Sequence, residues 1–321
     1  MTSYNKAHLN IIAKENGFIR DNLEKVLRLV KILNYFHEDE LLSKSLVLKG
    51  GTAINLTIFQ MPRLSVDIDL DCNINYSREE MLAQRQVINK EVMRYMLFEG
   101  YSLKPKSKSP LSLDSWVFGY TNAGGNADNI KIEINYSNRC HVQPSAERHV
   151  KIDFLGDIAV NVLDPLELYA SKINALVNRA AMRDLYDIYN MISANLFTSC
   201  NERSLLRKIF VFYHAVGAQS KAEEVSLTFP SLSKIENASY TTVKSQLIPV
   251  LRKSEKFDFT KTKETVVSFL QEFLQFSDDE KAFVQHFNRR EYHPEILFGD
   301  NECAARLAKH PMAIWKCRPK S

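Results

Sequence analysis

The hydrophobic pattern of the chain changes its period near residue 164, and this change constrains the fold most strongly. Between residues 101 and 162 the chain is rich in strand-like alternation of apolar and polar residues. From Asp164 to about residue 285, apolar residues recur at the spacing of amphipathic helices. The sequence Asp-Pro-Leu-Glu at 164–167 is typical of a helix start, with Asp as cap, Pro at the first position and Glu three residues after the cap. We therefore predict an α+β protein with one domain over 1–163 and a mainly helical domain over 164–321.

The first predicted domain mixes strands with helices. Helical spacing of apolar residues predicts helices over 18–38, 53–59 and 78–98. Short alternating or apolar runs predict strands at 45–49, 66–71, 116–121, 130–136, 149–153 and 157–162. We expect a mixed sheet with flanking helices, followed by short helices and loops in the tail from 290 to 321.

Composition excludes several classes of protein. Forty-two Lys and Arg against 38 Asp and Glu give a net charge of +4, too small to indicate a nucleic-acid-binding protein by itself. Five cysteines without a C-x-x-C pair argue against a disulfide framework or a zinc ribbon. No apolar run approaches the roughly 20 residues of a membrane span, and the first residues lack the apolar core of a signal peptide. We expect a cytoplasmic protein without membrane contact.

An acidic strand is the strongest candidate for chemistry. In the strand predicted over 66–71, alternation places Asp67, Asp69 and Asp71 on one face and the apolar residues on the other. Carboxylates packed this closely repel one another, so a cation is expected nearby. Mg²⁺ prefers oxygen ligands, usually one or two carboxylates plus substrate phosphates. The alternative is an edge strand that turns its acidic face to water.

A glycine pair precedes the acidic strand. Lys49-Gly50-Gly51-Thr52 follows a predicted strand and opens a predicted helix. Glycines let the backbone approach a phosphate, and a helix N-terminus favours an anion. The motif is not a P-loop, and alone it indicates only a turn. Beside the aspartates it predicts a triphosphate site, with amides for the phosphates and carboxylates for the metal.

Two further groups of charged residues complete the candidate site. Lys131, Glu133 and Asn135 share one face of the strand predicted over 130–136, where Glu133 can complete a metal shell or activate a hydroxyl. A surface Lys–Glu pair is the alternative. Lys172 and Arg179 share a helix face and can bind phosphates. Carboxylates from the Arg183-Asp-Leu-Tyr-Asp187 segment can hold such a cation, unless this is a solvated, salt-bridged surface.

Together these motifs resemble a known family. The order of these motifs is similar to that of the AbiEii-type nucleotidyltransferase toxins. Along the chain it reads K-G-G-T-A, R-L-S-V-D-I-D-L-D, K-I-E-I-N-Y, then D-P-x-E-L-x-A-x-K-I-x-A-L-x-x-R with R-D-L-Y-D-I-Y. This family includes the MenT-type toxins and belongs to the DNA polymerase β-like nucleotidyltransferase superfamily. The resemblance covers about residues 45–192. It implies a nucleotidyltransferase-like sheet domain whose active site lies in a cleft shared with the helical domain.

The resemblance implies a role for each motif. The implied metal ligands are Asp67, Asp69 and Glu133. The implied catalytic set is Asp67, Asp69, Glu133, Lys172 and Asp187. Lys172 would contact the triphosphate. Asp187 would fill the last acidic position, for which Asp184 is the alternative. The implied nucleotide-binding set is Lys49, Gly50, Gly51, Thr52, Arg63, Ser65, Lys131, Arg179 and Arg183.

The resemblance also implies an activity. Such proteins are toxins of type IV toxin–antitoxin systems that use Mg²⁺, with two ions possible, to transfer a nucleotide from a nucleoside triphosphate (NTP) to an acceptor. The implied acceptor is the 3′ end of tRNA, and the implied partner is an antitoxin. The alternatives are a protein or small-molecule acceptor, or an inert nucleotide-binding module. A basic groove would favour tRNA, and its candidate residues are Arg139, Arg148, Lys151, Lys309, Lys316, Arg318 and Lys320.

Overall fold

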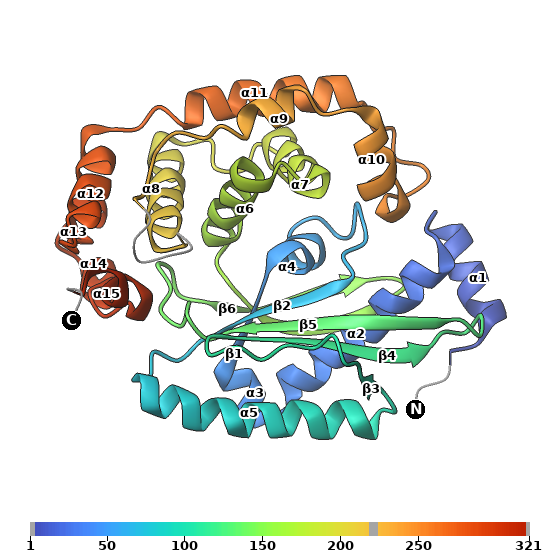
Figure 1. The fold of residues 1–321 in the computed structure, drawn as a ribbon. Coiled ribbons are helices and arrows are strands. Elements are labelled where there is room, and N and C mark those ends of the chain that lie inside the picture. Colours follow the sequence, from blue (N-terminus) through green and yellow to red (C-terminus); the bar gives the residue numbers. More distant parts are fainter. Residues whose placement is uncertain (1–3, 218–223, 319–321) are drawn as a thin grey trace. The chain divides into compact units, whose positions relative to one another are not determined.

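The computed structural model describes residues 4–217 and 224–318, and their contacts divide the chain into two units (Figure 1). The first unit holds the described parts of 1–139, 145–163 and 249–255. The second unit holds the described parts of 140–144, 164–248 and 256–321. The roles expected for 1–163 and 164–321 as functional domains stay a prediction.

Within its described residues, the first unit contains one mixed sheet of seven strands. The strands are β1 (Leu46–Lys49), β2 (Asp67–Cys72), β3 (Ser102–Leu103), β4 (Leu113–Thr121), β5 (Ala127–Asn135), β6 (Ala146–Ile152) and β7 (Gly156–Val162). Their order is β3-β4-β5-β2-β1-β7-β6. The pairs β2–β5 and β1–β7 are parallel, and the other neighbours are antiparallel. The predicted mixed sheet is confirmed, with the short edge strand β3 as an addition.

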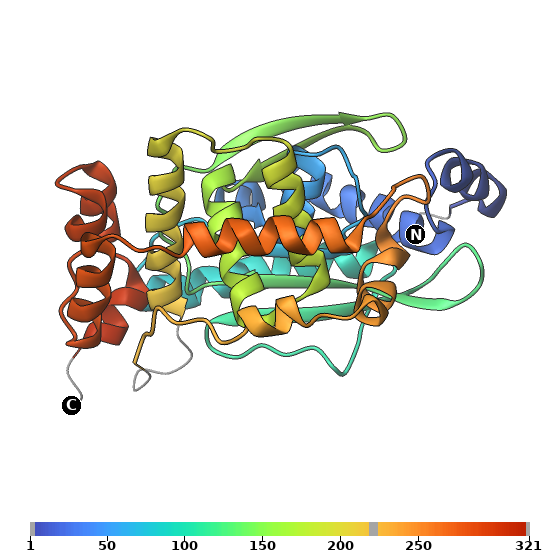
Figure 2. The ribbon, with the colours of Figure 1, turned by 90° about the horizontal axis from the view of Figure 1, so that it is seen from above.

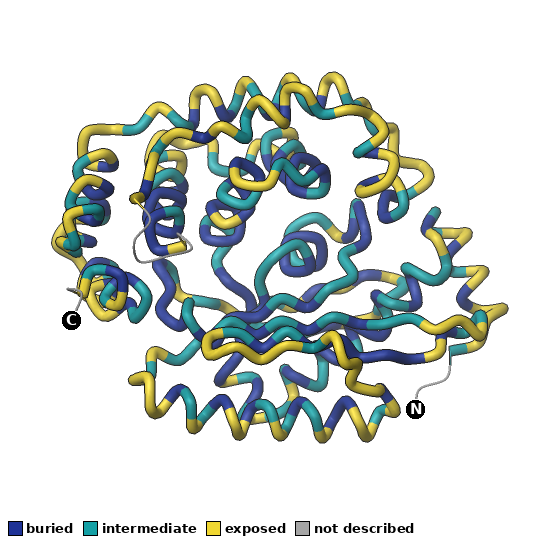
Figure 3. The backbone as a smooth tube through the Cα atoms, in the orientation of Figure 1, coloured by how far each residue is buried: buried dark blue, intermediate teal, exposed yellow. Residues whose placement is uncertain are grey.

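Helices cover both faces of this sheet. They are α1 (Lys6–Glu15), α2 (Arg20–Glu38), α3 (Glu40–Ser45), α4 (Gly50–Thr57) and α5 (Arg78–Phe98). Figure 1 shows α2, α3 and α5 on one face and α4 on the other, against β1 and β2. Helix α5 begins at a capping box between Ser77 and Glu80. Its outer side is exposed and its inner side buried (Figure 3), as expected for a helix on a sheet.

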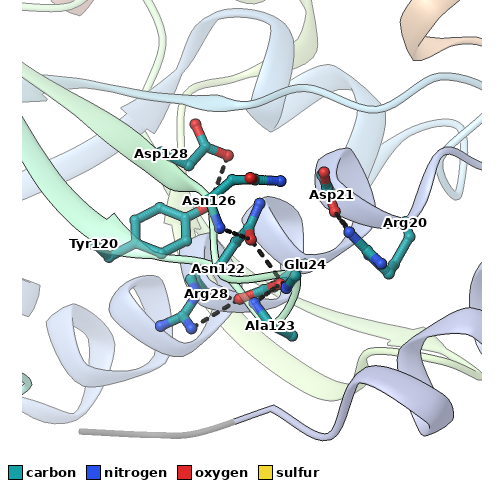
Figure 4. A network of polar contacts seen from close by, with 10 residues as sticks. Arg20, Asp21, Glu24, Arg28, Tyr120, Asn122, Ala123, Asn126 and Asp128 are labelled. Atoms are coloured by element: carbon teal, nitrogen blue, oxygen red, sulfur yellow. Dashed lines mark hydrogen bonds and ion pairs between the residues drawn. The ribbon is translucent and has the colours of Figure 1, made fainter.

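A buried ion pair joins α2 to the turn between β4 and β5 (Figure 4). Arg28 Nη2 lies 2.8 Å from Glu24 Oε1, and both side chains are buried. The other oxygen of Glu24 accepts the Ala123 N–H at 2.8 Å. The Arg28 guanidinium lies 4.3 Å from the centre of the Tyr120 ring. The turn between these strands is therefore fixed through charged groups rather than through apolar packing alone.

The described part of the second unit contains helices as its regular structure. These are α6 (Pro165–Arg179), α7 (Met182–Ser193), α8 (Cys200–Gly217), α9 (Leu232–Glu236), α10 (Tyr240–Gln246), α11 (Phe259–Phe273), α12 (Asp278–Asn288), α13 (Glu295–Phe298), α14 (Glu302–Leu307) and α15 (Pro311–Cys317). Figure 2 shows α11 running across α7, with which it packs. A short 3₁₀ turn, Ile248–Val250, leads from this part of the chain back to the first unit. The predicted helical C-terminal part is confirmed.

Residues 249–255 return to the first unit and pair with its loops. Val250 O accepts the Leu64 N–H at 2.8 Å, and Leu251 forms a β-bridge with Arg63. The Lys253 N–H donates to Gly17 O at 2.7 Å. This segment thus fastens the loop that carries Arg63 and Ser65, directly before the acidic strand β2.

Within residues 4–217 and 224–318, no helix combines the length and the apolar character needed to cross a bilayer.

Candidate active site

The acidic residues of β2 and β5 lie side by side in the sheet. The parallel register pairs Asp67 with Lys131 and Asp69 with Glu133. Both strands alternate half-exposed charged residues with buried apolar ones, Ile68 in β2 being an example. Glu133 therefore lies directly beside Asp69 on the neighbouring strand. Its role at a metal stays a prediction.

Asp71 differs from the other two aspartates of β2. Its side chain is buried and forms an ion pair with Lys49 at the end of β1. The antiparallel register of β1 and β2 places Lys49 opposite Asp69. Asp71 therefore positions Lys49, while Asp67 and Asp69 stay half-exposed.

The glycine pair lies against Asp69. Gly50 has φ +72°, a left-handed conformation that favours glycine. A Cβ atom at Gly50 would lie 2.5 Å from Asp69 Oδ2. A Cβ atom at Gly51 would lie 2.8 Å from Arg63 Nη2. The absence of side chains at both positions lets the backbone that opens α4 approach the acidic strand.

Side chains beneath this loop hold it in place. The Thr52 hydroxyl donates to the Asp67 backbone carbonyl at 2.5 Å and lies 3.0 Å from Ser65 Oγ. Arg63 is buried, and its Nη1 donates to Leu64 O at 3.1 Å. Thr52 and Arg63 were predicted to bind nucleotide. In this structure both are buried and support the loop, and direct contact with nucleotide stays a prediction.

Glu133 is held ionised by its neighbours. Its carboxylate lies 2.8 Å from Lys131 Nζ. Partial burial acts to raise the pKa of Glu133, but hydrogen bonds from Lys131 and Ser115 and the charges of Lys131 and Lys49 bring that pKa below its usual value. Sequence analysis missed Ser115, which lies opposite Glu133 on β4. A cross-strand partner has no local sequence signal.

In the second unit, Lys172 binds two aspartates. Its ammonium lies 3.0 Å from Asp184 Oδ1 and 3.1 Å from Asp187 Oδ2. The turn at Ala180, with φ +53°, lets α7 fold back on α6 and bring these carboxylates to Lys172. All three side chains are buried. Lys172 contacts both aspartates at nearly equal distances, so the choice between Asp184 and Asp187 for the last acidic role stays open.

Arg179 joins the same group. Its Nε lies 2.8 Å from Asp184 Oδ2, while the Arg179 side chain is 64% exposed. Burial acts to raise the pKa of Asp184, but the charge of Lys172 and the contacts with Arg179 lower that pKa. Arg183 is half-exposed at the start of α7. The expectation that this group and the acidic strand line one cleft stays a prediction.

The donors on β2 and β5 fit a magnesium ion. Asp67, Asp69 and Glu133 offer only carboxylate oxygens, which are hard ligands suited to Mg²⁺. Among the described residues these three carboxylates do not form a closed cluster of ligand atoms. Mg²⁺ usually takes one or two carboxylates and completes its shell with water and substrate phosphates, so a closed cluster of three is not needed.

Two residues that were predicted to line an exposed basic groove are buried, so the prediction is wrong for them. Arg139 is buried, and its Nε donates to Tyr76 O at 2.8 Å. Lys316 is buried, and its Nζ lies 3.4 Å from Ala215 O. Both carry out structural hydrogen bonding that the sequence pattern does not show. Arg148 is half-exposed, whereas Lys151, Lys309 and Arg318 are exposed, and Lys320 lies outside the described residues.

Comparisons with known proteins define the class and then the family. The class is that of the nucleotidyltransferases, in agreement with the mixed sheet, the glycine loop and the paired acidic strands. The family model described as "Nucleotidyl transferase AbiEii toxin, Type IV TA system" matches residues 32–283. The match covers well over half of the chain, so the protein belongs to the AbiEii family of nucleotidyltransferase toxins.

A solved structure has a similar fold. It is MenT4, a nucleotidyltransferase toxin from Mycobacterium tuberculosis H37Rv. The TM-score is 0.63 at 17% sequence identity, and the likeness covers 96% of this chain and 99% of that chain. No curated protein matches the sequence. The protein is thus a nucleotidyltransferase of a type IV toxin–antitoxin system, which implies an NTP substrate and an antitoxin.

Proposed function

We propose that this toxin transfers a nucleotide from an NTP to the 3′ end of tRNA with Mg²⁺ as cofactor. The observation that carries the proposal is the register of Asp69 and Glu133 on neighbouring strands, with the Gly50 backbone against Asp69. This register supports a metal site at these carboxylates, with a phosphate-binding loop beside it. We further propose that residues 1–163 carry this chemistry and residues 164–321 complete the cleft for nucleotide and acceptor.

Asp67, Asp69 and Glu133 would hold one or two Mg²⁺ ions. When bound, Mg²⁺ neutralises the triphosphate and favours in-line attack by an acceptor hydroxyl on the α-phosphorus. Asp67 and Asp69 are half-exposed and so accessible to solvent. Glu133 enters the reaction as a carboxylate because Lys131 and Ser115 lower its pKa.

The phosphates would bind to the backbone that opens α4. The amides at Gly50 and Gly51 lie at a helix N-terminus, which attracts anions. Lys49, held by Asp71, and Lys131 add positive charge beside the aspartates. Thr52, Arg63 and Ser65 maintain the loop and contribute to nucleotide binding through it.

Residues of the second unit would bind the triphosphate or the acceptor. Lys172 is fixed by Asp184 and Asp187, so little side-chain entropy is lost when it meets an anion. Arg179 is exposed beyond Asp184 and adds a second cation, with Arg183 as a third. A fixed cation of this kind stabilises the charge that develops on the leaving pyrophosphate.

Exposed lysines favour a nucleic-acid acceptor over a protein or small molecule. Lys104, Lys106 and Lys108 are all exposed along the connection from β3 to β4. Lys151 is also exposed, but it lies on β6 at the opposite edge of the sheet and outside this cluster. Clustered cations of this kind bind a phosphate backbone and release its counterions.

The test is labelling of tRNA by the full-length protein. Total tRNA, Mg²⁺ and each α-³²P-labelled NTP in turn are incubated with wild type, Asp69→Asn and the control Asp157→Asn. Asp157 is an exposed aspartate on β7 of the same sheet. Label in tRNA with wild type and with the control, but not with Asp69→Asn, supports the proposal.

Other outcomes of this experiment contradict it. Label that enters a protein or small-molecule fraction but not tRNA overturns the acceptor while keeping the enzyme. NTP binding without transfer to any acceptor supports an inert nucleotide-binding module. Transfer that survives in Asp69→Asn overturns the assignment of the metal site.

A further inference from the structure

Two histidines and a glutamate converge in the second unit: His286 lies in the last turn of α12, and Glu291 and His293 lie in the connection to α13. One ligand atom from each of His286, Glu291 and His293 lies within 4.8 Å of the others. Across residues 4–217 and 224–318, this is the only such group of three or more His, Cys, Asp or Glu ligands.

The contacts within the group bring nitrogen and oxygen donors together. His286 Nδ1 lies 2.5 Å from Glu291 Oε2. The two imidazole rings are 5.4 Å apart at an interplanar angle of 79°. His293 Nδ1 lies 2.8 Å from Glu295 Oε1, so a second carboxylate borders the group and fixes the His293 ring.

The loop that carries these ligands is anchored on both sides. The Glu291 N–H donates to His286 O at 2.9 Å, which closes the end of α12. The Tyr292 hydroxyl donates to Leu307 O at 2.6 Å, and Arg290 Nη1 donates to Lys316 O at 3.0 Å. The ligands are therefore held near one another before any ion binds, which reduces the entropy lost on binding.

Two isolated surface ion pairs do not account for this convergence. Separate His–Glu pairs on a surface contribute little to stability and need not face each other. A tetrahedral zinc ion with bonds of about 2.0–2.1 Å requires donors about 3.3 Å apart, and the ligand atoms of these three side chains all lie within 4.8 Å of one another, so small side-chain rotations suffice to reach that spacing. Imidazole also selects zinc-like ions over Mg²⁺, which separates this group from the oxygen-only carboxylates of β2 and β5.

We propose that His286, Glu291 and His293 bind one divalent transition-metal ion of the zinc type. A water molecule supplies the fourth ligand, and Glu295 orients the His293 ring from outside the group. The ion joins the end of α12 to the start of α13 and stabilises this part of the second unit. The proposal is independent of the nucleotide-transfer reaction, because its ligands belong to other residues than those proposed for catalysis.

The test is calorimetric titration of Zn²⁺ into the metal-free, full-length protein in excess Mg²⁺, which occupies oxygen-only sites. Wild type is expected to bind one Zn²⁺ with a micromolar or lower dissociation constant. His286→Ala and His293→Gln are each expected to weaken binding about tenfold or more. The control is His149→Ala, because His149 also faces a single glutamate, Glu147, at 2.8 Å on an exposed strand.

A second measurement identifies the ligands directly. In ¹⁵N-histidine spectra, Zn²⁺ is expected to shift the ring nitrogens of His286 and His293 and to leave those of His149 unchanged. Circular dichroism establishes that each variant is folded. A millimolar dissociation constant for wild type, or unchanged Zn²⁺ affinity in both variants, overturns the proposal.

Discussion

Replacing Gly50 with alanine tests whether the glycine loop positions Asp69. Gly50 has φ +72°, so an alanine side chain would be strained there by about 1–2 kcal/mol. Its Cβ would lie 2.5 Å from Asp69 Oδ2 and 3.2 Å from Asp69 Cβ, against ordinary contacts of 3.4 Å or more. The carboxylate or the loop must therefore move by about an ångström.

A displacement of this size has a large expected effect on catalysis. Misplacing a catalytic group by about 1 Å costs on the order of 100-fold in rate. We expect Gly50→Ala to reduce nucleotide transfer by about that factor. The free energy of unfolding should fall by only about 1–2 kcal/mol, because the strain is local.

The matched control is Gly156→Ala, at the first residue of β7. Gly156 has φ +84°, but no atom lies within 4 Å of a Cβ built there. Both variants should lose similar stability in urea unfolding, and only Gly50→Ala should lose transfer of label from NTP. Equal transfer activity in the two variants would refute the proposed positioning of Asp69 by the loop.

Three further perturbations test a buried carboxyl group, a buried ion pair and a turn in the left-handed conformation. Burial raises the pKa of Glu167 to about 7, from 4.5 in the unfolded chain, so the folded state holds the proton more tightly. Stability should therefore fall by up to about 3 kcal/mol as pH rises from about 4.5 through 7, and Glu167→Gln should remove this dependence in urea unfolding. Arg28→Met leaves Glu24 buried without its cation and should lower the unfolding free energy by about 3–5 kcal/mol. Ala180→Gly relieves a left-handed alanine at φ +53° and should raise the unfolding free energy by about 0.5–1 kcal/mol.

The first two of these have a matched control, and each of the three has a contradicting result. For Glu167→Gln the control is Glu202→Gln, an exposed glutamate in the same unit, and a pH dependence that persists in Glu167→Gln contradicts the raised pKa. For Arg28→Met the control is the exposed Lys44→Met, and an equal, small loss contradicts the role of burial. For Ala180→Gly, a lower free energy of unfolding contradicts the reasoning, because the backbone entropy of glycine then outweighs the strain of the left-handed alanine.

Much of the first unit could be predicted from local patterns. Alternation located β2 and β5 and assigned Asp67, Asp69 and Glu133 to polar faces, because side chains in a strand alternate by residue. The pairing of Asp69 with Glu133 could not be derived from the residues alone. It depends on which strands meet in the sheet and in what register, and those contacts are non-local.

The buried charges were beyond the reach of the sequence. Lys172 and Arg139 occur in patterns that equally fit solvated surfaces, and burial depends on partners that come from other elements. The return of residues 249–255 to the first unit also has no local signal. The run is short and mixes apolar with charged residues, and its significance comes from pairing with Leu64 and Gly17.

This returning segment determines when the first unit can be complete during synthesis. A ribosome that has made residue 163 has synthesised every strand of the sheet but not the residues that pair with Leu64 and Gly17. The loop carrying Arg63 and Ser65 gains these partners only after residue 255 has emerged, when much of the second unit has already been made. A nascent chain of this toxin therefore lacks part of the support beneath its acidic strand through most of its translation.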